Sequence, residues 1–465
     1  MVIPAGSSPS DSRFRLVWSS TWRIGCLLLG LGLIVLIALS FDDRLLDTTA
    51  LRYIPRVLSE ADNGYLVLAK AADRLGKPED LNGERFSDAL YGRSWDSARV
   101  EGWLKDREFA LATVRKTRAL QFGQKPVPED IAAAYGPQSA VHMPIQLAVI
   151  RARLFLHEGD TAAAASLVCD ALHAVRIVQD SRGDDLTYMY SIGAHLVAIE
   201  AAYAVISDPR TTVTDCRRLG DEITRSRSSR EEFTQMMAAD FRIKVLLAEA
   251  LTHPQSLPRD WKLSRKDSIG YRLPFLYKPN QSLNYIIPWF SYYESLLDLP
   301  FEEKRTQWTW RASQLPDLCE MHGDWLNAYG KRAAHDLLYP ALGGMINARL
   351  RQQTRCSIGE ALVALRRYHA ANSGQLPASL DELVPAYLSS VPLDYADGLP
   401  IKYSREMKAL WSVGENQFSP TEEGKPVDAK ALIVPVRFGG DYVLWPRLDP
   451  DQPSEESSGA FGHSR

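Results

Sequence analysis

An uncharged apolar run from Ile24 to Phe41, IGCLLLGLGLIVLIALSF, constrains this chain more than any other stretch. A helix rises about 1.5 Å per residue, so this run would be about 27 Å long, close to the roughly 30 Å hydrocarbon core of a bilayer. We therefore predict a transmembrane helix over residues 24–41, and the rest of the chain has to be placed relative to that lipid bilayer.

A cleaved secretory signal is the alternative interpretation of this run. Ala38-Leu39-Ser40 offers small residues suited to a signal peptidase, and three arginines precede the run. However, the run is longer than the roughly 7 to 15 residues of a signal core, which favours an uncleaved signal-anchor. Long soluble domains cross a membrane largely regardless of flanking charges. We therefore expect a single-pass protein of the inner (cytoplasmic) membrane with its body on the extracytoplasmic side.

The composition is that of an ordinary folded chain. Of the 465 residues, 45% are hydrophobic and 24% are charged, and the formal net charge is −3. A body of this length has room for two domains. A near-neutral chain without a basic stripe is not expected to bind nucleic acid.

Five cysteines leave two interpretations open. Cys26 lies in the apolar run, and the others are Cys169, Cys216, Cys319 and Cys356. In an oxidising compartment these four could form disulfides in any of three connectivities. Cysteines are also frequent buried hydrophobic residues, and Cys169 falls on an apolar helical face. We favour the buried interpretation, and the sequence does not determine a pairing.

Helical periodicity dominates residues 45–345. It predicts helices over Ile54–Leu75 (kinked or split in two), Trp95–Phe122, Leu147–His157, Thr161–Gln179, Leu186–Ile206, Thr214–Ser226, Arg230–Leu251 and Leu318–Leu350, the last broken near Pro340 and Gly343-Gly344. The short turn Glu158-Gly159-Asp160 makes its two helices antiparallel neighbours, with Asp160 or Thr161 as the N-cap. Because no further copies recur at a period of about 34 residues, we expect an irregular helical bundle and not a solenoid.

Aromatic residues accumulate between residues 255 and 315, where the periodicity fades. They include Trp261, Tyr271, Phe275, Tyr277, Tyr285, Trp289, Phe290, Tyr292, Tyr293, Trp308 and Trp310. Such rings could mark a binding groove or a membrane-surface contact. They more often pack against a core, so we expect an irregular segment wrapped on the helices, with short helices at its end.

Two places in the sequence put acids next to imidazoles, as general acid/base chemistry would require. His157 is followed by Glu158 and Asp160, and His335 by Asp336. Adjacent residues on a helix point in different directions, and a histidine at a helix C-terminus is a common favourable end group. We therefore predict no catalytic residue here.

A zinc site is a second candidate for chemistry. Cys319 and His322 could share one helix face, and His335 and Cys356 could complete a ligand set. The second pair lacks the short spacing of structural zinc sites. No HExxH, GxSxG or Walker-type pattern occurs, and the glycines of the apolar run imply no phosphate loop. We predict no cofactor-binding or metal-binding residue.

The period changes near the C-terminus. A helix over Ala361–His369 is expected to stop at Asn372-Ser373-Gly374, and Ser379-Leu380-Asp381-Glu382 has the pattern of a capping box that begins a short helix. Residues 399–404 and 409–413 alternate around a polar turn, which predicts a β-hairpin. The helix should lay its apolar face on a small sheet, with the following residues inside: Leu362, Leu365, Tyr368, Ile401, Tyr403, Leu410 and Val413.

The linked elements RYHAANSGQLP, SLDELV, VPLDYADGLPIKY and LWSVG resemble the C-terminal globular part of type II secretion major pseudopilins. The resemblance covers residues 346–436, about a fifth of the chain. It implies a small α+β module with an antiparallel sheet. We thus expect a mainly α protein with the following parts: a polar tail (1–23), a transmembrane signal-anchor (24–41), a helical domain (45–345), the pseudopilin-like module (346–437) and a C-terminal tail (438–465).

The chain also departs from those proteins. In major pseudopilins the module follows directly on an N-terminal hydrophobic helix with a peptidase site, whereas here some three hundred residues intervene. Their calcium loop corresponds to residues 415–418, Glu-Asn-Gln-Phe, which lack its Asp/Gly character. Glu422, Glu423 and Asp428 are nearby oxygen donors. Calcium in the 415–428 loop is therefore conceivable but not predicted.

The whole layout resembles large bacterial envelope proteins. We expect a non-enzymatic, single-pass, membrane-anchored protein whose body and module make protein–protein contacts, with secretion machinery as the implied partner. The alternative is an extracytoplasmic hydrolase whose site is assembled from residues far apart in the sequence. A deep pocket lined by convergent His, Asp or Glu side chains would favour the hydrolase.

Overall fold

The computed structural model describes residues 26–413, apart from 39, 77–80, 82, 93–94, 136–139, 259–260, 262, 298, 300–325, 339–341 and 407, together with residues 443–444. In this part the chain is mainly helical and carries one small antiparallel sheet, as predicted. The N-terminal tail, Cys319, His322, Trp308, Trp310 and the 415–428 loop lie outside the described residues.

The elements follow one another in two groups. The first group is η1 (Thr49–Leu51), α2 (Gly64–Leu75), α3 (Glu84–Tyr91), α4 (Ser97–Leu104), α5 (Glu108–Thr117), α6 (Ile131–Ala134), α7 (His142–Glu158), α8 (Thr161–Gln179), α9 (Asp185–Ser207), α10 (Val213–Arg225) and α11 (Arg230–Thr252). The second is η3 (Pro254–Ser256), α12 (Arg265–Gly270), α13 (Pro279–Ser295), α15 (Ala328–Ala333), the π-helical turn η5 (Ala334–Leu338), α16 (Leu342–Ala371), η6 (Leu380–Leu383), β1 (Lys402–Ser404), β2 (Ala409–Trp411) and β3 (Val443–Leu444). An apolar helix over Cys26–Ala38 precedes them.

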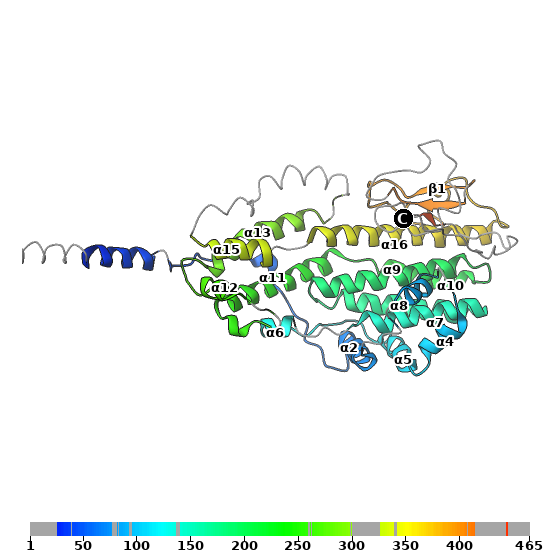
Figure 1. Cartoon of the computed structure of the whole chain (residues 1–465). Helices are drawn as coiled ribbons and strands as arrows, with labels where there is room; N and C mark the ends of the chain where they lie inside the picture. The colour runs from blue at the N-terminus through cyan, green and yellow to red at the C-terminus, as the bar shows by residue number, and fades with distance from the viewer. Residues whose placement is uncertain are drawn as a thin grey trace, which may run out of the picture.

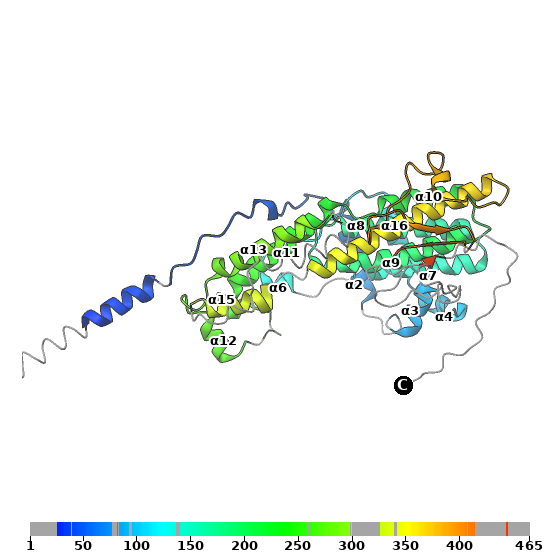
Figure 2. The ribbon, with the colours of Figure 1, turned by 90° about the horizontal axis from the view of Figure 1, so that it is seen from above.

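The body is elongated, and the apolar helix continues beyond one of its ends (Figures 1 and 2). We call that end, formed by α12, α13 and α15, the proximal end, and the opposite end the distal end. A proximal core is built from α11, α13, α15, η5 and the start of α16. A distal core is built from α2–α5, α7–α10, the middle and second half of α16, η6 and the sheet. The two cores share α16, which runs from one to the other.

All five helices predicted between residues 147 and 251 are present as α7–α11. The predicted turn also holds, because the Asp160 carboxylate accepts the backbone N–H of Ala163 at 2.9 Å and caps α8. By length and composition alone α8 and α9 could cross a membrane, yet 72% and 67% of their most apolar windows are buried inside the protein. The central helices of a soluble core pass the same criterion, so this is weak support for a membrane span.

Two predicted helices are wrong in their extent. Residues 54–62 are not helical, because this stretch hydrogen-bonds to other segments and contains Pro55, and α2 begins only at Gly64 behind the N-cap Asn63. The predicted helix from Trp95 to Phe122 is split into α4 and α5. Asp106 lies at the break with φ of 63°, a left-handed conformation that a helix cannot continue through.

The aromatic segment is more regular than predicted. Its central part is the 17-residue helix α13, and the rings of Trp289, Phe290, Tyr292 and Tyr293 are buried in the proximal core. Packing of these rings against helices is confirmed. The break predicted near Pro340 and Gly343-Gly344 does not fall at the glycines, because both lie inside α16, which begins at Leu342, and Pro340 lies outside the described residues.

The predicted helix and hairpin pack against each other, but the capping box is wrong, because Ser379 makes no side-chain cap to the 3-10 turn η6. Tyr368, expected inside, is only half-buried. Leu362 and Leu365 of α16 are buried together with Ile401 and Leu410, while Tyr403 packs at the edge of the same core. In the sheet, of order β1-β2-β3, Tyr403 lies opposite Leu410. The expected boundary between residues 345 and 346 falls inside the continuous helix α16, and the sheet shares the distal core with α7–α10.

Candidate functional site

The most specific arrangement in the described part of the chain surrounds an extended segment, residues 41–60, which we call the strap. It joins the apolar helix to α2 and runs along α13 and α11 toward the connection between α8 and α9 (Figure 2). Polar contacts hold it to the body at both ends and in the middle. The strap therefore determines how the apolar helix is connected to the folded body.

At its proximal end the strap caps a helix. The Asp42 carboxylate accepts the backbone N–H groups of Asn280 at 2.8 Å and Gln281 at 3.1 Å, in the first turn of α13. An anion is favourable there because the free N–H groups and the helix dipole make this end positive. The Asn284 side chain donates to the Arg44 carbonyl at 2.9 Å and accepts from the Leu46 N–H at 2.9 Å. The strap is thus fixed to α13 directly after the apolar helix.

In its middle the strap contributes to the proximal core through the buried side chain of Leu51 in η1. Further on, the Ile54 N–H donates to the Gln235 side chain of α11 at 3.3 Å. The strap is therefore fixed to α11 as well as to α13.

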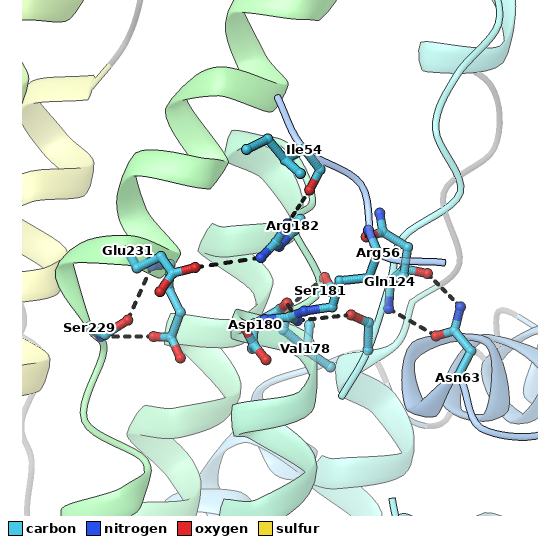
Figure 3. A network of polar contacts seen from close by, with 12 residues as sticks. Ile54, Arg56, Asn63, Gln124, Val178, Asp180, Ser181, Arg182, Ser229 and Glu231 are labelled. Carbon is cyan, nitrogen blue, oxygen red and sulfur yellow. Dashed lines mark hydrogen bonds and ion pairs between the residues drawn. The ribbon is translucent and has the colours of Figure 1, made fainter. Parts of the chain in front are cut away.

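At its distal end Arg56 makes the principal contact (Figure 3). Its guanidinium donates to the Asp180 carboxylate and to the Asp180 carbonyl, both at 2.6 Å, and lies over the Phe122 ring. The Arg56 backbone N–H donates to the Gln124 side chain at 2.7 Å. Burial raises the pKa of Asp180, and the hydrogen bond and charge of Arg56 oppose this shift.

Two other segments join the same network (Figure 3). Asn63 and Gln124 exchange hydrogen bonds, from the Asn63 side chain to the Gln124 carbonyl at 2.8 Å and from the Gln124 N–H to the Asn63 side chain at 2.9 Å. Arg182 donates to the Ile54 carbonyl and to the Glu231 carboxylate of α11. The strap, the α8–α9 connection and the start of α11 are therefore held by one set of contacts.

A row of buried charges continues from this network. Lys125 donates to the Asp184 carboxylate at 2.8 Å; burial alone would raise the pKa of Asp184, but Lys125 and Thr187 bring it below its ordinary value. Asp240 pairs with Lys244 at 3.5 Å, and burial raises the pKa of Asp240 to about 7. The charge of the neighbouring Lys244 opposes this shift without cancelling it.

Asp240 was missed in the sequence, where an Asp and a Lys four residues apart look like an ordinary surface pair on a helix. Burial between α6, α9 and α11 raises the pKa of Asp240, and no local sequence pattern indicates this burial. Within the described residues no group of three His, Cys, Asp or Glu side chains is placed to hold a metal ion.

The residues considered for acid/base chemistry lie at separate places. The His157 ring stacks on Trp95 with centroids 4.3 Å apart, while Asp160 caps α8. His335 and Asp336 differ from the expectation, because their side chains hydrogen-bond at 2.6 Å, which lowers the pKa of Asp336. The pair lies in the π-helical turn and is exposed at the proximal end.

Three of the four described cysteines behave as buried hydrophobic residues, and Cys26 is exposed in the apolar helix. Cys169, Cys216 and Cys356 are free, buried thiols. Cys356 lies 3.7 Å from His195, but burial raises the pKa of Cys356 to about 12 and lowers that of His195 to about 3. Neither is charged at neutral pH, so the pair is not an activated thiolate. Cys356 is in the distal core and His335 on the proximal surface, so these two cannot share a zinc ion.

A small cavity of about 140 Å³ lies between α3 and α4, lined by Arg85, Ala89, Asp96, Arg99, Val100 and Trp103. Ligand sites usually have volumes of about 300 to 1,000 Å³. The cavity is therefore smaller than a usual small-molecule site.

We expect Arg56→Ala to loosen the strap and to lower the free energy of unfolding by about 2 kcal/mol, because the half-buried Asp180 carboxylate loses its cation. Limited proteolysis and urea unfolding of the detergent-solubilised full chain would measure both effects. Arg52→Ala is the matched control: it removes the same charge from an exposed position of the same strap. Equal effects of the two substitutions would contradict the role of Arg56.

Compared with known proteins, the chain matches no family model, no curated protein and no solved structure.

Proposed function

We propose that the protein is a single-pass, membrane-anchored envelope protein of the cytoplasmic membrane. Its extracytoplasmic body would make protein–protein contacts and would not catalyse a reaction. The observation that carries the proposal is the exposure of the helix Cys26–Ala38, whose leucine, isoleucine and valine side chains are all between 43% and 76% exposed. Leaving each in water forfeits roughly 1.5 to 3 kcal/mol of burial energy, and a bilayer would recover it.

The strap gives this anchor a fixed relation to the body. Contacts begin at Asp42, four residues after the end of the apolar helix, and continue to Arg56. A flexible linker would let the body rotate freely above the membrane. A strap held along its length instead supports a body whose proximal end stays next to the bilayer.

Such an anchor would hold the C-terminal module on the part of the body away from the membrane (Figure 1). Two large apolar side chains of this module, Leu393 and Leu399, are 48% and 54% exposed. Exposed apolar residues on a rigid module suit a protein partner. The resemblance of residues 346–436 to major pseudopilins supports a component of a secretion machinery as that partner.

Membrane retention and topology test the proposal directly. We expect the protein to stay in the pellet after carbonate extraction and its body to be digested by protease added to spheroplasts. Crosslinking in intact membranes followed by mass spectrometry should find protein partners attached to the module. Release by carbonate, or a body protected in spheroplasts, would contradict the proposed anchoring or orientation.

Leu33→Arg should reduce membrane insertion by about 3 kcal/mol, because the charge falls near the centre of the predicted span. The fraction of protein in the carbonate-resistant pellet measures this effect. Leu46→Arg is the control, since Leu46 is exposed in the strap outside the apolar run. If both variants remain equally membrane-bound, residues 24–41 are not the anchor.

A further inference from the structure

The proximal end of the body carries a cluster of basic side chains. Residues 263–278, which include α12 and lead into α13, contain four basic residues and only one acidic residue, in a chain whose formal net charge is −3. Arg265, Lys266 and Arg272 are exposed. Within the described part of the chain, no carboxylate lies within ion-pair distance of these three. We call Arg265, Lys266 and Arg272, together with Ile269 between them, the basic foot.

The foot is held firmly on the body. Tyr271 packs against Tyr277 and Tyr329, with ring centroids 5.0 and 5.2 Å away. The contact is so close that a Cβ atom at Gly270 would lie 2.2 Å from the Tyr329 ring. Asp267 is the one acidic residue, and its carboxylate accepts a hydrogen bond from the Arg332 guanidinium of α15 at 3.0 Å. The basic side chains are therefore presented from a rigid surface, and the neighbouring carboxylate already has a cation.

The position of the foot is as important as its charge. α12 and α15 lie at the end of the body next to the apolar helix in both views (Figures 1 and 2). The strap holds this end in place, since Asp42 caps α13 at Asn280 and Gln281, in the helix that follows α12. At the centre of the foot Ile269 is 52% exposed, although it is a large apolar side chain. Basic residues around an exposed apolar side chain match the boundary between headgroups and acyl chains.

We propose that the basic foot binds anionic phospholipid headgroups of the same bilayer that holds the apolar helix. This inference rests on the proposed membrane anchoring and adds a second contact with the membrane to it. Arg265, Lys266 and Arg272 pair with the phosphates, and Ile269 enters the headgroup layer. Each basic residue near an anionic surface strengthens the attraction roughly fivefold, and this attraction falls off within a Debye length of about 8 to 10 Å.

A fluorescent probe can test this contact in the full-length protein. The probe, a nitrobenzoxadiazole dye, is attached through Ile269→Cys in a background that carries Cys26→Ala and Cys319→Ala. Cys26 is an exposed thiol in the apolar helix, and Cys319 lies outside the described residues. The protein is reconstituted in phosphatidylcholine vesicles with or without phosphatidylglycerol, and each preparation carries a spin label on some headgroups. We expect strong quenching at position 269 when phosphatidylglycerol is present. A probe attached through Thr214→Cys, at the distal start of α10, should show little quenching.

Reversing the three charges together, by Arg265→Glu, Lys266→Glu and Arg272→Glu, should reduce quenching at position 269 to the level of the distal probe. Circular dichroism checks that this variant is folded, and the three conservative changes Arg265→Lys, Lys266→Arg and Arg272→Lys should keep the quenching. Arg217→Glu on the distal part of α10 is the control for a single charge reversal elsewhere.

Two results would overturn the inference. One is equal quenching at positions 269 and 214, and the other is quenching at 269 that depends neither on phosphatidylglycerol nor on the three charges. Carbonate extraction of the same vesicles separates the two proposals. Retention without the expected quenching rejects the foot and leaves the anchoring intact, whereas release from the vesicles rejects both.

Discussion

Asp394→Ala is expected to destabilise the C-terminal module by about 3 to 5 kcal/mol, since it leaves several buried donors without an acceptor. Asp394 is fully buried. One carboxylate oxygen accepts the Thr354 hydroxyl at 3.2 Å and the Ala396 N–H at 2.9 Å, and the other accepts the Val413 N–H at 2.9 Å. One side chain thus joins α16, the loop before β1 and the segment directly after β2.

Trypsin sensitivity and urea unfolding measure this effect. Arg405 and Lys408 in the hairpin turn are cleavage sites that open when the module loosens. Asp397→Ala is the matched control, because Asp397 pairs with Lys402 at 3.3 Å near the surface and should contribute only about 1 kcal/mol or less. Asp394→Asn keeps one acceptor and should fall between the two. Similar losses for Asp394→Ala and Asp397→Ala would mean that the buried contacts do not hold the module.

Leu365→Ala should lower the free energy of unfolding by about 2 to 5 kcal/mol, the usual loss when a buried leucine is truncated and a cavity remains. Leu365 is 1% exposed and lies in the distal core, which contains both the sheet and α7–α10. Because this core is shared, we expect the module and the distal helices to lose stability together, in one transition. Urea unfolding followed by circular dichroism and by trypsin cleavage at the hairpin should report the same midpoint.

Leu399→Ala is the control for this truncation. It removes the same atoms from a side chain that is 54% exposed, so the change should stay within about 0.5 kcal/mol. If Leu365→Ala moves only the trypsin signal and leaves the helical signal unchanged, the module folds independently of the body.

The parts of the fold that the sequence predicts well are those whose determinants are local. Helices α7 to α11 follow from apolar spacing, and Asp160 caps α8 because the capping residue and the N–H that it binds are three positions apart. The hairpin follows from alternation around a polar turn. In α13 the aromatic residues and Pro288 obscure the helical spacing, and only burial in the proximal core shows its regularity.

The contacts of the strap could not be predicted in the same way. Arg56 and Asp180 are 124 positions apart, and nothing near either residue indicates the other. The same holds for Asp394 and Thr354, which look like ordinary polar residues of a loop and a helix. The secondary structure expected from the pseudopilin resemblance is present in residues 346–413, but neither that relationship nor a secretion-related role is tested by these elements, and both stay predictions.

The position of α16 has a consequence for the order in which this chain can mature. Residues 342–350 belong to the proximal core and residues 356–365 to the distal core, so both cores need the same late helix. While the ribosome is still synthesising the chain, the apolar faces of α9 and α10 lack the helix that packs on them. Any product truncated before residue 342 would leave both faces open, which makes such fragments ready substrates for chaperones and quality-control proteases.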